Sequence, residues 1–168
     1  MRIKKLNYSP EWKNLPDVHV GIITTFQKSF PVKVGDIAKA LKLTVKQATL
    51  PAGISGEIKE VDGQFIIRVN RHDVKYRQRF TVAHEISHFL LHRDKIGDGI
   101  IDDVLYRSSL SDALEAQANR LAADIIMPGE LIEKELNMLG QIEIEEVEEI
   151  AKLAEVSTTA LKIKLGLN

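Results

Sequence analysis

The sequence contains no cysteine, and this absence excludes two kinds of site. Disulfide bridges cannot form, and thiolates cannot hold a metal ion. Any metal site in this chain must therefore be built from histidine and carboxylate side chains. The lack of cysteine also fits a reducing compartment.

Long apolar segments are absent as well. The basic residues 1–8 are not followed by the apolar stretch of a signal peptide, and no apolar run approaches the ~20 residues that cross a bilayer. A formal net charge of −1 gives no general attraction to nucleic acid. We therefore expect a cytoplasmic protein that neither contacts a membrane nor binds nucleic acid directly.

The most informative pattern present is HExxH, formed by His84, Glu85 and His88. On a helix the two histidines lie about 40° apart around the axis, so both imidazoles can face one metal ion. Glu85 lies about 100° away from His84, which suits a carboxylate that acts as a general base beside the metal rather than as a ligand. The motif therefore predicts a metal-dependent hydrolase.

The residues around the motif favour a buried helix. HExxH also arises by chance, and the alternative is a core helix whose histidines form nothing more than hydrogen bonds. Six neighbouring positions are apolar, as expected of a helix that lies beneath a functional site. These positions are Val82, Ala83, Ile86, Phe89, Leu90 and Leu91.

The periodicity of the remaining apolar residues predicts an α+β fold. It is mainly helical, with a small three-stranded antiparallel sheet packed beside the HExxH helix. The strands are expected at residues 45–50, 54–61 and 65–69, with Asp62-Gly63 as the hairpin turn. Further helices are expected at residues 18–30, 35–43, 112–127, 130–139, 143–154 and 157–165, an irregular arm at 1–17 and a loop at 93–107.

A catalytic zinc ion usually has three protein ligands, so the motif needs a third. His92 continues the four-residue spacing, but it lies about 12 Å from His84 along a straight helix, which is too far for one ion. Glu115 is a better candidate, since it shares a helix face with small alanines that permit close approach. Asn119, one turn further, is placed to orient a ligand histidine. An exposed first-turn acid favoured by the helix dipole is an equally good interpretation of Glu115.

A family resemblance then decides between these interpretations. Residues 79–92 read RFTVAHEISHFLLH, residues 115–128 read EAQANRLAADIIMP, and residues 50–56 read LPAGISG. Together they resemble the ImmA/IrrE family of bacterial zinc metallopeptidases over roughly residues 31–165. The resemblance implies that His84, His88 and Glu115 bind zinc and that Glu85 is the general base. Manganese or iron would also suit this ligand set.

The resemblance also implies a biological role, and the length of the chain fits one core with a small helical appendage. Residues 1–128 are expected to form the metallopeptidase core, and residues 129–168 a C-terminal helical subdomain. The implied activity is that of an intracellular endopeptidase that cleaves a helix-turn-helix repressor of a mobile element or stress regulon. His92 and Tyr106 are candidates for a second group that stabilises the transition state, although each has an equally good structural interpretation. The alternatives are a regulatory module that docks to a DNA-binding partner without proteolysis, and a latent protease.

Overall fold

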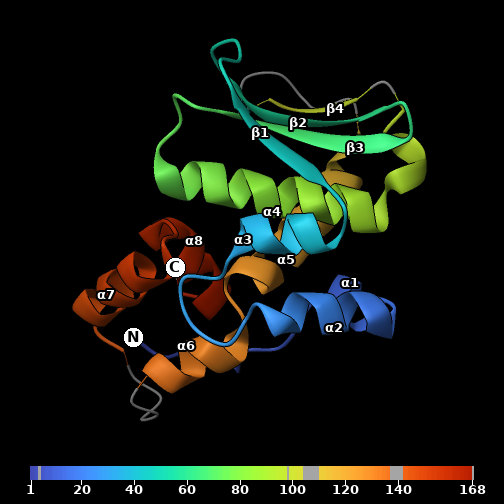
Figure 1. The fold of residues 1–168 in the computed structure, drawn as a ribbon. Helices are drawn as coiled ribbons and strands as arrows, with labels where there is room; N and C mark the ends of the chain where they lie inside the picture. Colours follow the sequence, from blue (N-terminus) through green and yellow to red (C-terminus); the bar gives the residue numbers. More distant parts are fainter. Residues whose placement is uncertain (4, 98, 104–109, 137–141, 168) are drawn as a thin grey trace.

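The computed structural model of the chain describes all residues except 4, 98, 104–109, 137–141 and 168 (Figure 1). Helices and one sheet make up the fold. The elements are α1 (Pro10–Lys13), α2 (Asp17–Thr25), α3 (Val34–Ala40), β1 (Thr44–Ala48), β2 (Ile54–Val61), β3 (Gln64–Asn70), α4 (Lys75–Leu91), the 3-10 helix η1 (Arg93–Lys95), β4 (Ile100–Asp103), α5 (Asp112–Ile126), α6 (Gly129–Glu135), α7 (Ile144–Ala154) and α8 (Thr158–Leu165). The predicted α+β class is confirmed.

The sheet differs from the prediction in both size and direction. It has four strands in the order β1-β3-β2-β4, and β1 pairs with β3 in parallel, while the other pairs are antiparallel. The expectation of a three-stranded antiparallel sheet was therefore wrong. The fourth strand was overlooked because its apolar part is just Ile100-Ile101, with acidic residues and glycines around it. The parallel pairing depends on contacts between segments that lie far apart in the chain, which periodicity does not reveal.

The hairpin between β2 and β3 forms at the predicted turn. Asp62 and Gly63 both have positive φ, at 51° and 75°. Strand β2 has the predicted bounds. Because β2 and β3 are both interior strands, the edges of the described sheet are β1 and β4.

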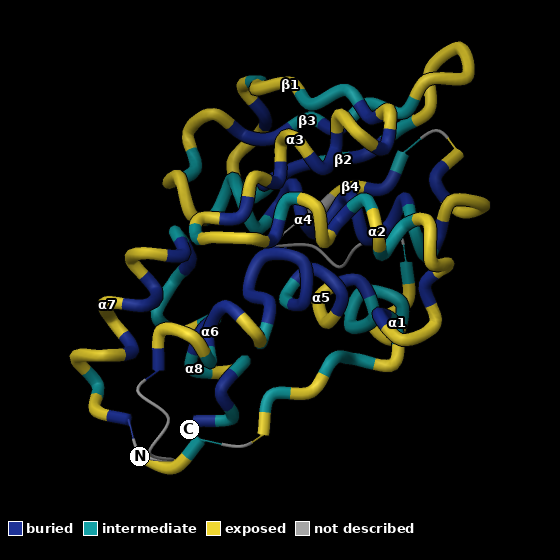
Figure 2. The backbone as a smooth tube through the Cα atoms, turned by 60° about the horizontal axis from the view of Figure 1, so that its bottom comes forward, coloured by how far each residue is buried: buried dark blue, intermediate teal, exposed yellow. Residues whose placement is uncertain are grey.

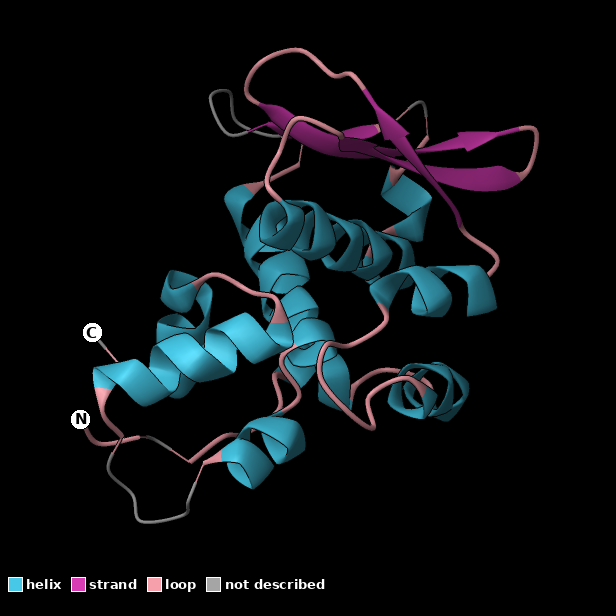
Figure 3. Cartoon of the chain, turned by 60° about the vertical axis from the view of Figure 1, so that its left-hand side comes forward, coloured by secondary structure: helices cyan, strands magenta, loops and turns pink. Residues whose placement is uncertain are grey.

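Helix α4, which carries the motif, lies directly under the sheet. Figure 3 shows the sheet as one layer with the helices on one side of it, and Figure 1 places α4 between the sheet and α5. A close approach at Gly56 in β2 makes this packing possible. A Cβ atom there would overlap Thr81 Cγ2 of α4 and lie 2.9 Å from the Arg68 carbonyl oxygen. Burial is concentrated along α4 and α5 (Figure 2).

The N-terminal arm is more ordered than expected. The hydroxyl of Ser9 accepts a hydrogen bond from Trp12 N, and Pro10 occupies the first turn, where its missing N–H costs nothing, so the short helix α1 forms. Ser9 also donates from its N–H and its hydroxyl to Asp124 Oδ2. The arm is thereby fastened to α5.

The C-terminal helices α6, α7 and α8 begin close to their predicted starts. The predicted helix at 130–139 runs into residues 137–141, which lie outside the described part of the chain. Between α7 and α8, Glu155 adopts a left-handed conformation with φ 53°, and its carboxylate forms ion pairs with Lys75 Nζ at 2.9 Å and Arg79 Nε at 3.4 Å. The turn is thereby fixed to the first half of α4.

A single cluster of buried apolar side chains includes Trp12, Ile86 and Leu161 and so spans the proposed division at residue 128. That division stays a prediction. Among the described residues no helix is both long and apolar enough to cross a membrane.

Candidate metal centre

The two histidines of the motif face the same point beside α4. His84 and His88 are 3% and 0% exposed, and their Nε2 atoms lie 3.0 Å apart. The rings are perpendicular, with centroids 4.6 Å apart. The helical spacing of four residues therefore brings the two Nε2 atoms together, as the sequence predicts.

Glu115 reaches this point from the first turn of α5. Its Oε2 lies 3.1 Å from His84 Nε2, and its Oε1 lies 3.2 Å from His88 Nε2. The helix begins there because the hydroxyl of Ser111 accepts a hydrogen bond from Leu114 N. The side chain of Glu115 is 20% exposed, so solvent reaches the group from its side.

These three side chains form a group that is compatible with a metal ion. One ligand atom from each lies within 4.8 Å of the others. Two ligands bound at about 2.1 Å to a tetrahedral ion are about 3.4 Å apart, so the observed spacings need to widen by a few tenths of an ångström. Two imidazoles and one carboxylate form a donor set that suits zinc and several other divalent ions.

The outer nitrogen of His84 is held by an amide. Asn119 Oδ1 lies 2.8 Å from His84 Nδ1. An amide oxygen accepts hydrogen bonds, so Nδ1 carries the proton and the lone pair of Nε2 is directed toward Glu115 and His88. Asn119, one helical turn beyond Glu115, thus contacts the side of the His84 ring that faces away from Glu115 and His88.

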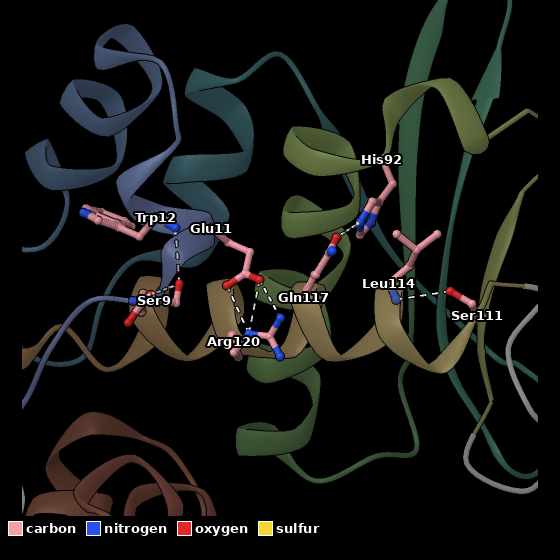
Figure 4. A network of polar contacts seen from close by, with 9 residues as sticks. Ser9, Glu11, Trp12, His92, Ser111, Leu114, Gln117 and Arg120 are labelled. Atoms are coloured by element: carbon pink, nitrogen blue, oxygen red, sulfur yellow. Dashed lines mark hydrogen bonds and ion pairs between the residues drawn. The ribbon is translucent and has the colours of Figure 1, made fainter.

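His88 is held in the same way by a two-residue chain. His92 Nε2 donates to Gln117 Oε1 at 2.9 Å (Figure 4). The Nδ1 atoms of His88 and His92 are 3.0 Å apart. Gln117 fixes the proton of His92 on Nε2. The Nδ1 atom of the neutral His92 ring must therefore accept the proton that His88 carries on its own Nδ1. The lone pair of His88 Nε2 is then available to a metal ion.

His92 thus lies behind His88 and not beside the paired Nε2 atoms, where a transition-state donor is expected. The other candidate for that role, Tyr106, falls outside the described residues. Gln117 was missed by the sequence analysis, since nothing in its spacing sets it apart from other polar residues on α5. His92 had a usable signal: it lies one turn beyond His88 on the same face of the helix.

Burial favours the neutral form of His88. It lowers the pKa of His88 below the ordinary histidine value, although the nearby Glu115 carboxylate, which favours the protonated ring, opposes this shift. A neutral imidazole is the form that binds a metal ion. Glu85, next to His84 on α4, is also fully buried.

Comparison with known proteins adds a family match. A model described as the IrrE N-terminal-like domain, of peptidase family M78, matches residues 38–166. A radiation response metalloprotease IrrE from Deinococcus deserti is 37% identical over 95 residues, which are 56% of this chain and 34% of the relative. Its counterpart from Deinococcus radiodurans is 36% identical over 104 residues, which are 59% and 31% of the two chains. The matched segment spans about one third of each relative.

Proposed function

Because the chain belongs to the IrrE N-terminal-like family of peptidases, we propose that it is a metal-dependent endopeptidase that cleaves a protein substrate. The observation that supports this most is the convergence of Glu115 from α5 on the paired Nε2 atoms of His84 and His88. Two separate helices place three ligand groups at one point. A core helix with hydrogen-bonded histidines has no need for this arrangement.

In this proposal each side chain has a defined task. His84, His88 and Glu115 hold a divalent cation, for which zinc is our first choice and manganese or iron are alternatives. When bound, such an ion supplies a Lewis acid that makes water more acidic and polarises a peptide carbonyl. Glu85 receives the proton that the attacking water releases and passes it to the leaving amine. Asn119, with the pair formed by His92 and Gln117, keeps the two imidazoles in the ligand tautomer and orientation.

The proposed substrate is a helix-turn-helix transcriptional repressor, as the family resemblance implies, and the proposed location is the cytoplasm. An extended substrate segment can be held by strand addition to a sheet edge. The β2–β3 hairpin does not offer such an edge, since both of its strands are interior in the described sheet. Strand addition would have to use β1 or β4.

The proposal is tested by incubating the protein with the repressor that is encoded next to its own gene. The metal-loaded protein is expected to cut it at one bond, and a chelator is expected to stop the reaction. Glu85→Gln should abolish cleavage and leave the metal content unchanged, while Glu148→Gln, at an exposed position on α7, serves as the matched control. A protein that holds its metal but cuts the repressor equally well with and without Glu85 would show that the proposed chemistry is wrong.

The alternative function is docking to a DNA-binding partner without proteolysis. It is favoured by the pair of helices α7 and α8, which a tight turn at Glu155 joins in the manner of a helix-turn-helix. The acidic surface of α7 opposes direct DNA binding. A stable complex with the repressor that is insensitive to chelator and leaves the repressor intact would favour this alternative. Activity that appears after a partner or more metal is added would indicate a latent protease.

A further inference from the structure

An apolar pocket lies between the first half of α4 and the start of α8. Its volume is about 260 Å³, and its apolar lining comes from Tyr76, Phe80, Val156, Ala160 and Ile163. Arg77 of α4, Ser157 just before α8 and Thr159 of α8 also line the pocket. The volume is sufficient for one large side chain. This pocket is separate from the metal group described above.

The pocket adjoins the metal group through one side chain, that of Phe80. Phe80 lines the pocket, and its ring stacks on that of His84 with centroids 6.5 Å apart and an interplanar angle of 29°. Along α4, Phe80 and Tyr76 precede His84 by four and eight residues, about 6 and 12 Å at the helical rise. These two pocket residues therefore precede the ligand His84 by about 9 Å on average along the axis of α4, and Phe80 lies about 40° from His84 around that axis.

The side chains at the mouth of the pocket are not part of the core. Ile163 is 73% exposed and Tyr76 is 46% exposed. Exposed apolar residues that line one pocket, beside a group that can hold a metal, indicate a surface that becomes covered when a ligand binds.

The ion pairs of Glu155 with Lys75 and Arg79 fix the α7–α8 turn to α4 at the residue before Val156. The two walls of the pocket are therefore held in place without a ligand. A preformed pocket loses little conformational entropy on binding.

We propose that this pocket is a substrate subsite that receives a large apolar side chain such as leucine, isoleucine, methionine or phenylalanine. The proposal rests on the endopeptidase function given above and names part of the substrate. An extended peptide advances about 3.3 Å per residue, so an offset of about 9 Å along α4 corresponds to a substrate residue roughly two or three positions from the cleaved bond. We expect the preference for a large apolar residue either before or after the cleaved bond, and not on both sides of it.

Arg77 adds a polar side chain to the lining, and its Nε donates to Ser55 Oγ of β2 at 3.1 Å. The rest of the lining is mostly apolar, so the pocket is expected to accept apolar side chains.

The experiment compares cleavage preferences of variants. The metal-loaded protein is incubated with the neighbouring repressor and with a peptide library made from a bacterial proteome, and the cut bonds are read by mass spectrometry. We expect a large apolar residue two or three positions from the cut, and alanine at that position should lower kcat/KM roughly 10- to 200-fold. Ile163→Asp and Tyr76→Ala should remove most of this discrimination. Val18→Asp, at a 65% exposed position on α2, should leave it intact.

The outcomes separate the subsite from the proposed function. Cleavage without a positional apolar preference, or a preference that Ile163→Asp and Tyr76→Ala leave unchanged, overturns the subsite while the endopeptidase function stands. A metal-loaded protein that cuts neither the repressor nor any peptide overturns both. Metal content and thermal unfolding of each variant, measured beside the wild type, distinguish a lost subsite from a lost fold.

Discussion

The Nδ1 atoms of His88 and His92 lie 3.0 Å apart, one helical turn from each other on α4. Two nitrogens at this distance share one proton, and the bond from His92 Nε2 to Gln117 Oε1 decides which ring carries it. A side chain that is too distant to bind the metal together with His84 can therefore control how His88 binds it.

His92→Phe is expected to weaken metal binding by about 10- to 100-fold, since it removes the acceptor that orients His88. The phenyl ring fills a similar space, so the fold should persist. The affinity is measured by competition with a chromophoric zinc chelator. His72→Phe, at an exposed position, is the control and should leave the affinity unchanged. Equal affinities for the two variants would contradict the support that we assign to His92.

Glu115→Gln is expected to reduce metal affinity by about 100-fold or more, because a charged ligand has a larger effect than the residues that orient ligands. An amide has nearly the same shape, so the change mainly tests charge and ligation. Asp112→Asn, in the same first turn of α5, is the matched control. Isothermal titration with zinc reports both affinities. If the two variants bind zinc equally well, the third ligand is not Glu115.

Much of this site was predictable from local pattern, and the limits of that prediction have physical causes. The spacing of His84 and His88, and the face shared by Glu115 and Asn119, follow from helical geometry alone. The strand β4 does not, because a two-residue apolar run gives no periodicity to detect. Its pairing with β2 forms through contacts that bring distant segments together.

The same distinction applies to Gln117 and to the parallel strand pair. Gln117 contributes through a hydrogen bond to a residue 25 positions away, which no local pattern encodes. The parallel pairing of β1 with β3 likewise depends on the way the chain returns through β2.

Gly56→Val is expected to destabilise the fold by about 1–3 kcal/mol, because the new side chain would collide with Thr81 of α4 and the Arg68 carbonyl. Chemical denaturation measures the free energy of unfolding. Gly21→Ala is the opposite case: no atom lies within 4 Å of its added Cβ, and the change within α2 should stabilise by about 0.4–1 kcal/mol. Similar effects of the two substitutions would argue against close packing of β2 on α4.

Glu11 gives a prediction for acid pH. Its hydrogen bonds to Arg120, which join α1 to α5, lower its pKa below the ordinary value of 4.5, although burial opposes this shift (Figure 4). A lowered pKa means that the carboxylate stabilises the fold above pH ~4.5 and loses this contribution as the pH falls through the lower folded value. The melting temperature of Glu11→Gln should therefore lie below that of the wild type at pH 7 and approach it as the pH falls below the lowered pKa of Glu11. A difference that stays constant with pH would show that the charge of Glu11 is not responsible.

The ion pairs that Glu155 forms with Lys75 and Arg79 of α4 limit how much of the C-terminus can be deleted. The side chain of Arg79 is 14% exposed, and the carboxylate that faces it is supplied by the turn between α7 and α8. An open reading frame that stops at residue 128 would encode every side chain of the metal group. It would remove the carboxylate that pairs with this guanidinium, together with buried core side chains such as Val147 and Leu161. Expression fragments and fusion junctions should therefore be placed beyond α8, and a stop codon near residue 128 should behave genetically as a null allele.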